Sequence, residues 1–97
     1  MDRVLGTLKN VKGKRIVVEG HSDNVPVRGR LLQRYPTNWE LSAARAMNVV
    51  RYLETKGVPP ALLSGLGYGE HAPITLNDTE EGRRKNRRMR IILMPIE

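Results

Sequence analysis

The sequence predicts an α/β domain in which helices pack on a β-sheet. Apolar, β-branched runs alternate along the chain with segments of helical periodicity, in the order α-β-α-β-α-β. The length of 97 residues suits one domain, and the content of 39% hydrophobic and 28% charged residues is that of a globular protein. We therefore expect residues 1–97 to form a single domain.

The first elements are predicted by contrasting hydrophobic patterns. Residues 2–11 carry apolar side chains at helical spacing and are predicted to form the last turns of a helix. Residues 15–20 (RIVVEG) are apolar and β-branched without that period, which indicates a short strand buried on at least one face. Residues 21–36 contain glycine and two prolines and are predicted to be a loop. So long a loop in a small domain is a candidate functional segment.

The clearest helix is predicted over residues 37–56. Thr37 and Glu40 have the spacing of a capping box, with Asn38 as a competing N-cap. Gly57 is the expected glycine just past the end of the helix. The predicted buried stripe consists of Ala43, Ala46, Met47, Val50 and Leu53. Its small alanines would let the helix lie close to a sheet.

Two strands and a short helix are predicted after residue 60. Residues 62–68 and 88–94 have strand patterns, and Thr79 is placed to cap a short basic helix that ends near Asn86. The glycine-rich segment at 65–69 is weakly similar to a phosphate loop. Because no lysine and no long helix follow it, we interpret the segment as a tight turn.

Composition removes several classes of function. The chain has no cysteine, which excludes a disulfide framework, a thiol nucleophile and a thiolate metal site. No apolar run approaches the roughly 18–20 residues that a membrane span requires. Seventeen lysines and arginines against ten acidic residues give a net charge of +7. This charge favours a polyanionic partner or surface and does not bear on the fold.

An anion and a cation are predicted to meet where the long helix begins. Asp23 follows the first strand, Arg45 lies two turns into the helix, and the N–H groups of residues 38–41 are exposed at the helix start. Such a pocket complements a zwitterion, which carries an ammonium beside a carboxylate. The alternative is a structural salt bridge between Asp23 and Arg45 that ties the loop to the helix, and the charge pattern leaves both interpretations open.

Two further features allow a functional or a structural interpretation. His21 could be a ligand or a general base, but the only other histidine is His71 and no paired carboxylates lie at metal-ligand spacing, which favours a packed, hydrogen-bonded histidine. Six basic residues between Arg83 and Arg90 could bind nucleic acid or anionic lipid. Aromatic residues that stack on bases are missing around them, and some of the six could instead close a pocket.

Several motifs together resemble the OmpA-like peptidoglycan-binding domain. They are GHSDN at 20–24, NWELSAARA at 38–46, GYGE at 67–70, Pro73 and NDTEEGRRKNRR at 77–88. The resemblance covers residues 15–94, and the link that contains DNVP and YPTNWELS is similar to the version in flagellar motor stator B (MotB-like) proteins. Since the helix at 2–11 would normally follow a strand, we expect the family's first strand to be missing and the chain to be an N-terminally truncated fragment of a larger protein.

The resemblance implies an OmpA-like two-layer sandwich with a mixed sheet that binds peptidoglycan through meso-diaminopimelate of the stem peptide. It implies no catalysis, no metal and no cofactor. It assigns Asp23 to the ammonium and Arg45 to the carboxylate of diaminopimelate, in agreement with the zwitterion pocket. Asn38 and Arg87 match two further binding positions, and Leu41 is expected to contribute through its backbone.

The same resemblance implies a place and partners. It locates the domain in the periplasm, as the wall anchor of a membrane-anchored envelope protein or flagellar stator.

Residues 25–36 are too apolar for a purely solvated loop, so we expect them to fold beside the pocket without supplying specific ligand contacts. A basic nucleic-acid-binding module formed by residues 83–90 is the alternative function. A wall hydrolase has the least support, because no acid/base pair or zinc site is visible.

This sequence departs from the family's usual pattern in three respects. Ser22 replaces the usual threonine and keeps the hydroxyl, and Arg90 stands where an acidic residue is frequent. The missing first strand would leave an edge of the sheet open. We therefore expect self-association, as a homodimer, through that edge or through an exchanged N-terminal helix.

Overall fold

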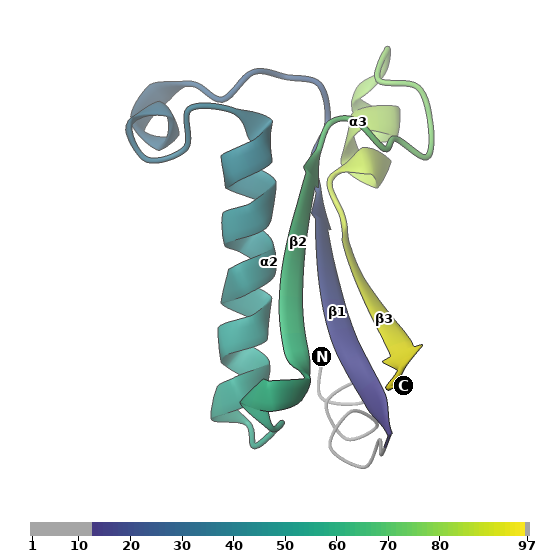
Figure 1. Ribbon diagram of the computed structural model, residues 1–97. Coiled ribbons are helices and arrows are strands. Elements are labelled where there is room, and N and C mark those ends of the chain that lie inside the picture. The colour runs from purple at the N-terminus through teal and green to yellow at the C-terminus, as the bar shows by residue number, and fades with distance from the viewer. Residues whose placement is uncertain (1–12, 97) are drawn as a thin grey trace.

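The structure is a computed structural model that describes residues 13–96 (Figure 1). Its elements are β1 (Lys14–His21), the 3-10 helix η1 (Gly29–Gln33), α2 (Asn38–Thr55), the 3-10 helix η2 (Pro60–Leu62), β2 (Leu63–Gly69), α3 (Glu80–Asn86) and β3 (Met89–Pro95). The strands and helices predicted from residue 15 onward are all present, close to their predicted bounds. The helix predicted over residues 2–11 lies outside the described residues.

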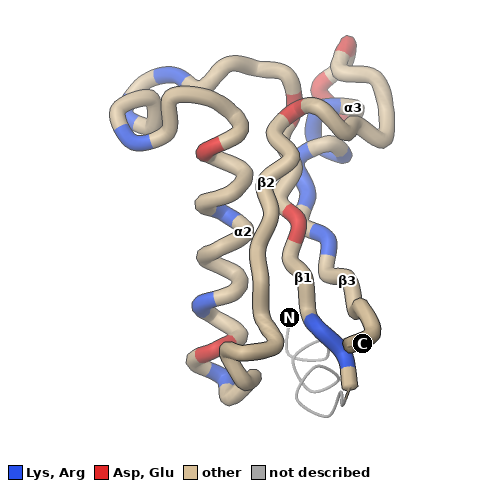
Figure 2. The backbone as a smooth tube through the Cα atoms, in the orientation of Figure 1, with Lys and Arg blue, Asp and Glu red and all other residues tan. Residues whose placement is uncertain are grey.

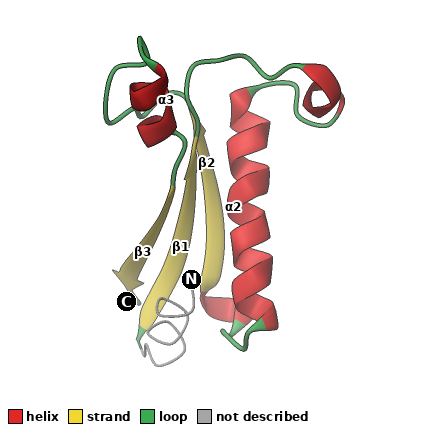
Figure 3. Ribbon diagram, turned by 180° about the vertical axis from the view of Figure 1, so that it is seen from behind, coloured by secondary structure: helices red, strands yellow, loops and turns green. Residues whose placement is uncertain are grey.

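β1 is the central strand of a three-stranded sheet with the order β2-β1-β3. It runs parallel to β2, with Ile16 opposite Leu63, and antiparallel to β3, with Val18 opposite Ile91. Both of its edges are therefore hydrogen-bonded, and α2 lies along one face of the sheet (Figure 3). Ile16 and Val18 of β1, which pack with residues of α2, are fully buried. The predicted α/β architecture, with helices packed on a mixed sheet, is confirmed.

The hydrophobic core lies between α2 and the sheet. Its buried members are Ile16, Val18, Ala46, Val50, Leu53 and Val58. Leu41 and Ser42 are also buried, whereas Met47, which the helical pattern placed in the stripe, is 38% exposed. Met47 does lie over Gly65, but β2 is an edge strand, so solvent reaches this side chain from outside the sheet.

Glycines in the sheet let α2 approach closely. A Cβ on Gly20 would overlap the backbone oxygen of Ser42, and a Cβ on Gly67 would lie 2.6 Å from the backbone nitrogen of Ala43. The interpretation of the segment 65–69 as a tight turn is wrong, because these residues belong to β2. Gly65 and Gly67 serve packing against α2 instead of reversing the chain.

Both ends of α2 have the chemistry that the sequence predicted. The Thr37 hydroxyl accepts a hydrogen bond from the backbone of Trp39, and the Glu40 carboxylate accepts one from the backbone of Thr37. Thr37 is therefore the N-cap of a capping box, and Asn38 is the first helical residue. Gly57 has a φ of 100°, which only glycine adopts without strain, and it ends the helix.

Two sets of hydrogen bonds bring α3 to the end of β1. The backbones of His21 and Arg88 exchange a pair of hydrogen bonds of 2.9 and 3.3 Å. The fully buried Asn86 accepts from the backbones of Ile74 and Thr75 and donates to Thr75 and Asn77, which holds the preceding loop against the helix. Figure 1 shows the result, with α3 beside the end of β1.

Candidate functional site

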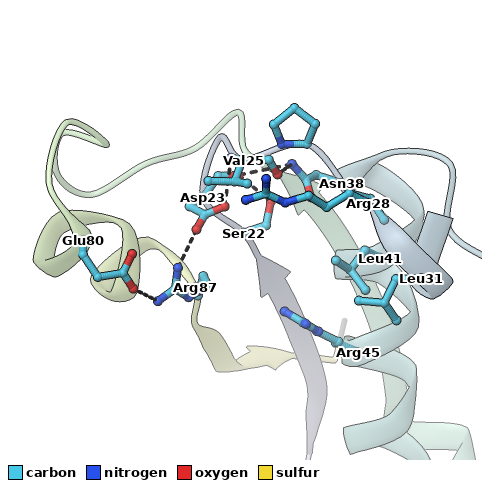
Figure 4. Close-up of a pocket in the computed structure, with 12 residues that line it drawn as sticks. Ser22, Asp23, Val25, Arg28, Leu31, Asn38, Leu41, Arg45, Glu80 and Arg87 are labelled. Carbon is cyan, nitrogen blue, oxygen red and sulfur yellow. Dashed lines mark hydrogen bonds and ion pairs between the residues drawn. The ribbon is translucent and has the colours of Figure 1, made fainter.

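A pocket of about 290 Å³ opens where β1 ends and α2 begins, beside α3 (Figure 4). All five residues assigned from the resemblance line it: Asp23, Asn38, Leu41, Arg45 and Arg87. The other lining residues are Ser22, Val25, Pro26, Val27, Arg28, Leu31 and Glu80. The fold thus brings together Asp23 and Arg87, which lie 64 positions apart in the sequence.

Asp23 supplies the buried anion of the pocket. The residue is only 5% exposed, and its Oδ1 accepts a hydrogen bond of 3.0 Å from the backbone N–H of Val25. Its Oδ2 lies 2.6 Å from Nη1 of Arg87. Each carboxylate oxygen accepts one bond and keeps a further lone pair, so Asp23 can accept from a ligand as well.

Arg45 supplies an unneutralised cation on the opposite wall. It extends from α2 one turn after Leu41, whose buried side chain forms apolar wall beside it (Figure 4). Among residues 13–96, no side chain or carbonyl forms an ion pair or hydrogen bond with Arg45. The structural salt bridge between Asp23 and Arg45 is therefore not formed, because Asp23 pairs with Arg87 instead.

Arg87 connects two acidic residues of the pocket. Its Nη1 donates to Asp23, and its Nη2 lies 2.6 Å from Oε1 of Glu80. The hydrogen bond from Arg87 is the main cause that lowers the pKa of Glu80, and Glu80, ahead of Asp23, raises the pKa of Arg87. Glu80 is a pocket residue that the sequence reasoning missed. The sequence feature that could have indicated its role is its position in the first turn of α3, two helical turns before Arg87.

Asn38 holds the backbone around Asp23. Its buried side-chain amide donates to the carbonyl oxygens of Asp23 and Val25, at 3.3 and 3.0 Å. The start of α2 thereby fixes the turn that presents the Asp23 carboxylate.

The segment predicted to fold beside the pocket does so. Val25, Pro26, Val27, Arg28 and Leu31 form one wall, and η1 gives order to a stretch that the sequence predicted as an open loop. Arg28 is a second lining residue that sequence reasoning did not assign to the pocket, since nothing in the loop pattern indicated which basic side chains face inward.

His21 and the basic run have structural partners. His21 is buried, bonds Glu19 through Nε2 at 3.2 Å and stacks on Tyr68, which confirms the packed interpretation. In the basic run, Arg87 closes the pocket, and Arg83 and Arg88 donate to loop carbonyls. The basic residues of this run therefore contact several different parts of the chain. Figure 2 shows lysines and arginines spread over several elements of the molecule.

Two classes of feature are not found in the described part of the chain. Between residues 13 and 96, no three histidine, cysteine or acidic side chains gather in a way that could hold a metal ion. The same residues include no helix with the length and apolar character needed to cross a membrane.

Residues 1–87 match the OmpA family. The chain belongs to the OmpA family. The resemblance of its motifs to that family is thereby confirmed.

Individual relatives extend the likeness. The chain is 37% identical to motility protein B of Bacillus subtilis over 83 residues, which is 84% of this chain and 31% of that protein. It is 37% identical to the peptidoglycan-binding protein ArfA of Mycobacterium bovis over 93 residues, which is 96% of this chain and 26% of that protein. The solved cell wall anchor of the T6SS from Pseudomonas aeruginosa has a TM-score of 0.82 and 37% identity, over 98% of this chain and 63% of that one. The chain thus spans about a third or less of the two curated relatives.

Proposed function

We propose that this OmpA-family domain binds peptidoglycan without catalysing a reaction, and that its pocket holds the diaminopimelate of the stem peptide. The observation that carries the proposal is that Asp23 and Arg45 line one pocket without pairing with each other. Diaminopimelate presents an ammonium and a carboxylate on one carbon, so the two charges of the pocket complement it. Asp23 accepts from the ammonium, and Arg45 donates two parallel hydrogen bonds to the carboxylate.

The other three assigned residues have supporting parts in this proposal. Arg87 orients the Asp23 carboxylate through their 2.6 Å contact, and Asn38 holds the backbone of the same turn. Leu41 provides apolar surface for the methylene chain of the ligand, and its contribution through the backbone stays a prediction.

Two of the three relatives support binding to the wall. ArfA is a peptidoglycan-binding protein, the Pseudomonas structure is a cell wall anchor, and the Bacillus protein is motility protein B. These three proteins belong to different systems, and contact with the cell wall is common to two of them. We propose that the present chain is one periplasmic wall-anchoring domain of a longer, membrane-anchored envelope protein, and that a flagellar stator is one such protein.

Retention on purified sacculi tests the proposal against the nucleic-acid alternative. At about 150 mM salt we expect the protein to stay on sacculi and to elute from heparin or DNA, because a purely electrostatic contact weakens steeply with salt. Sacculi stripped of stem peptides by an amidase are the matched control and should retain little protein. Equal retention on DNA and on intact sacculi would favour the basic module instead.

A homodimer through an open edge of the sheet belongs to the same proposal. Among the described strands, β2 and β3 each have one edge without a partner, and such edges can pair with a second chain. We expect light scattering to show a dimer whose fraction rises with protein concentration. A constant monomer mass at high concentration would contradict this part of the proposal.

A further inference from the structure

Arg87 lies between two carboxylates that belong to different parts of the chain. Its Nη1 lies 2.6 Å from Asp23, at the end of β1, and its Nη2 lies 2.6 Å from Glu80, at the start of α3. Each nitrogen meets a different carboxylate, so the guanidinium bridges the two acids. With all three groups ionised, this triad of Asp23, Arg87 and Glu80 carries a net charge of −1.

The charge of the triad matters for a ligand ammonium. If Asp23 had only Arg87 beside it, the two would form a neutral pair, and Arg87 would repel a cation that approached Asp23. Glu80 contacts the same guanidinium, so it lies well within a Debye length of about 8–10 Å from Asp23, and its charge is felt there. Arg83 also contacts Glu80, so the two carboxylates and the two guanidiniums of this cluster balance, whereas without Glu80 the two guanidiniums would leave a net positive charge beside Asp23.

The position of Glu80 is held by its surroundings. Thr79 caps α3 by accepting from the backbone of Gly82 at 3.0 Å, which sets Glu80 in the first turn. Nε of Arg83 donates to the second carboxylate oxygen of Glu80 at 3.3 Å. The Arg87 hydrogen bond also lowers the pKa of Glu80, so the carboxylate is ionised at neutral pH.

The two sides of the pocket therefore differ in whether their guanidinium groups are paired. Figure 4 shows Glu80 and Arg87 on the side of α3, with Asp23 beside them, and Arg45 on the side of α2. On the α3 side, Arg87 pairs with Asp23 and Glu80, and Arg83 pairs with Glu80, so two carboxylates balance two guanidiniums. The α2 side carries the guanidinium of Arg45, which has no partner among residues 13–96.

We propose that Glu80 is a positioning residue of this pocket, which acts through Arg87 by neutralising its guanidinium so that Asp23 holds the ligand's ammonium. This inference rests on the proposed function, since it assumes that Asp23 receives an ammonium. Glu80 itself needs no contact with the ligand.

The test compares Glu80→Gln with Glu81→Gln by calorimetric titration of a diaminopimelate-containing stem tripeptide. Both variants remove one negative charge from α3, but Glu81 is 80% exposed, pairs with Lys85 and does not line the pocket. Glutamine at position 80 keeps an oxygen that can accept from Arg87, so the variant removes the charge and retains a hydrogen bond. A melting curve of each variant checks that it is folded.

At about 20 mM salt we expect Glu80→Gln to bind roughly fivefold more weakly than the unchanged protein, and Glu81→Gln to differ by less than about twofold. At about 0.5 M salt the loss in Glu80→Gln should shrink below about twofold, because screening acts on charge and not on shape. A loss that salt does not change, or an equal loss in both variants, would overturn the inference.

The same titrations separate this inference from the proposed function. If Asp23→Asn abolishes binding while Glu80→Gln binds normally at low salt, the role of Glu80 is wrong and the pocket assignment stands. If a folded Asp23→Asn protein binds normally, the proposed function fails, and the inference fails with it.

Discussion

Replacing Arg45 by alanine is expected to weaken binding of a diaminopimelate-containing stem peptide about tenfold to a hundredfold. Charge-assisted hydrogen bonds contribute roughly 1.5–3 kcal/mol each, and the carboxylate would lose its cationic partner. Arg45 has no ion pair or hydrogen bond within residues 13–96, so its removal leaves no partner stranded there. We therefore expect the melting temperature of Arg45→Ala to stay close to that of the unchanged protein.

Two further variants distinguish recognition from a general charge effect. Arg45→Lys should also bind poorly, because an ammonium cannot make the planar, two-pronged contact with a carboxylate. Arg51→Ala is the matched control, since Arg51 lies on the same helix, bonds only Asn48 among the described side chains and does not line the pocket. Calorimetric titration beside a melting curve measures both quantities. Normal binding by a well-folded Arg45→Ala protein would remove the basis of the proposed function.

Gly67→Ala is expected to destabilise the domain by about 2–3 kcal/mol. A Cβ at this position would lie 2.6–2.7 Å from the backbone nitrogen, Cα and Cβ of Ala43. These atoms belong to the helix itself, so the clash is relieved only if α2 moves away from β2. Urea denaturation measures the loss of unfolding free energy.

Gly65→Ala is the matched control on the same strand and the same face of the sheet. Its Cβ would lie 2.5 Å from Sδ of Met47, the far end of a flexible and partly exposed side chain. Because that side chain can turn aside, we expect a loss below about 1 kcal/mol. An equal loss of unfolding free energy in the two variants would mean that Gly67 is not required for the close spacing of α2 and β2.

Local chemistry in the sequence was sufficient to predict the α-helices and strands from residue 15 onward, but not the 3-10 helices η1 and η2. The capping box of Thr37 and Glu40 and the glycine at 57 place both ends of α2, and the cap at Thr79 places the start of α3. These signals act between residues at most a few positions apart, so no knowledge of the fold is needed to use them. Strand patterns identified the three strands but did not distinguish a glycine-rich strand from a turn, as the segment 65–69 demonstrates.

The order of the strands in the sheet determined which side chains of α2 are buried, which local patterns did not. Met47 has the right helical phase for the core, yet it is partly exposed because the strand beneath it forms the edge of the sheet. Whether a strand is central or at an edge depends on pairings between residues far apart in the sequence, which periodicity does not encode.

The sequence by itself identified three of the five charged residues that line the pocket, since the family motifs contain Asp23, Arg45 and Arg87, and it missed Arg28 and Glu80. Only the tertiary structure decided how these charges pair. It places Arg87 against Asp23 and Glu80 at 2.6 Å and leaves Arg45 without a partner among the described residues. The physical reason is that an ion pair depends on distances of a few ångströms between side chains, and those distances are set where β1, α2 and α3 meet.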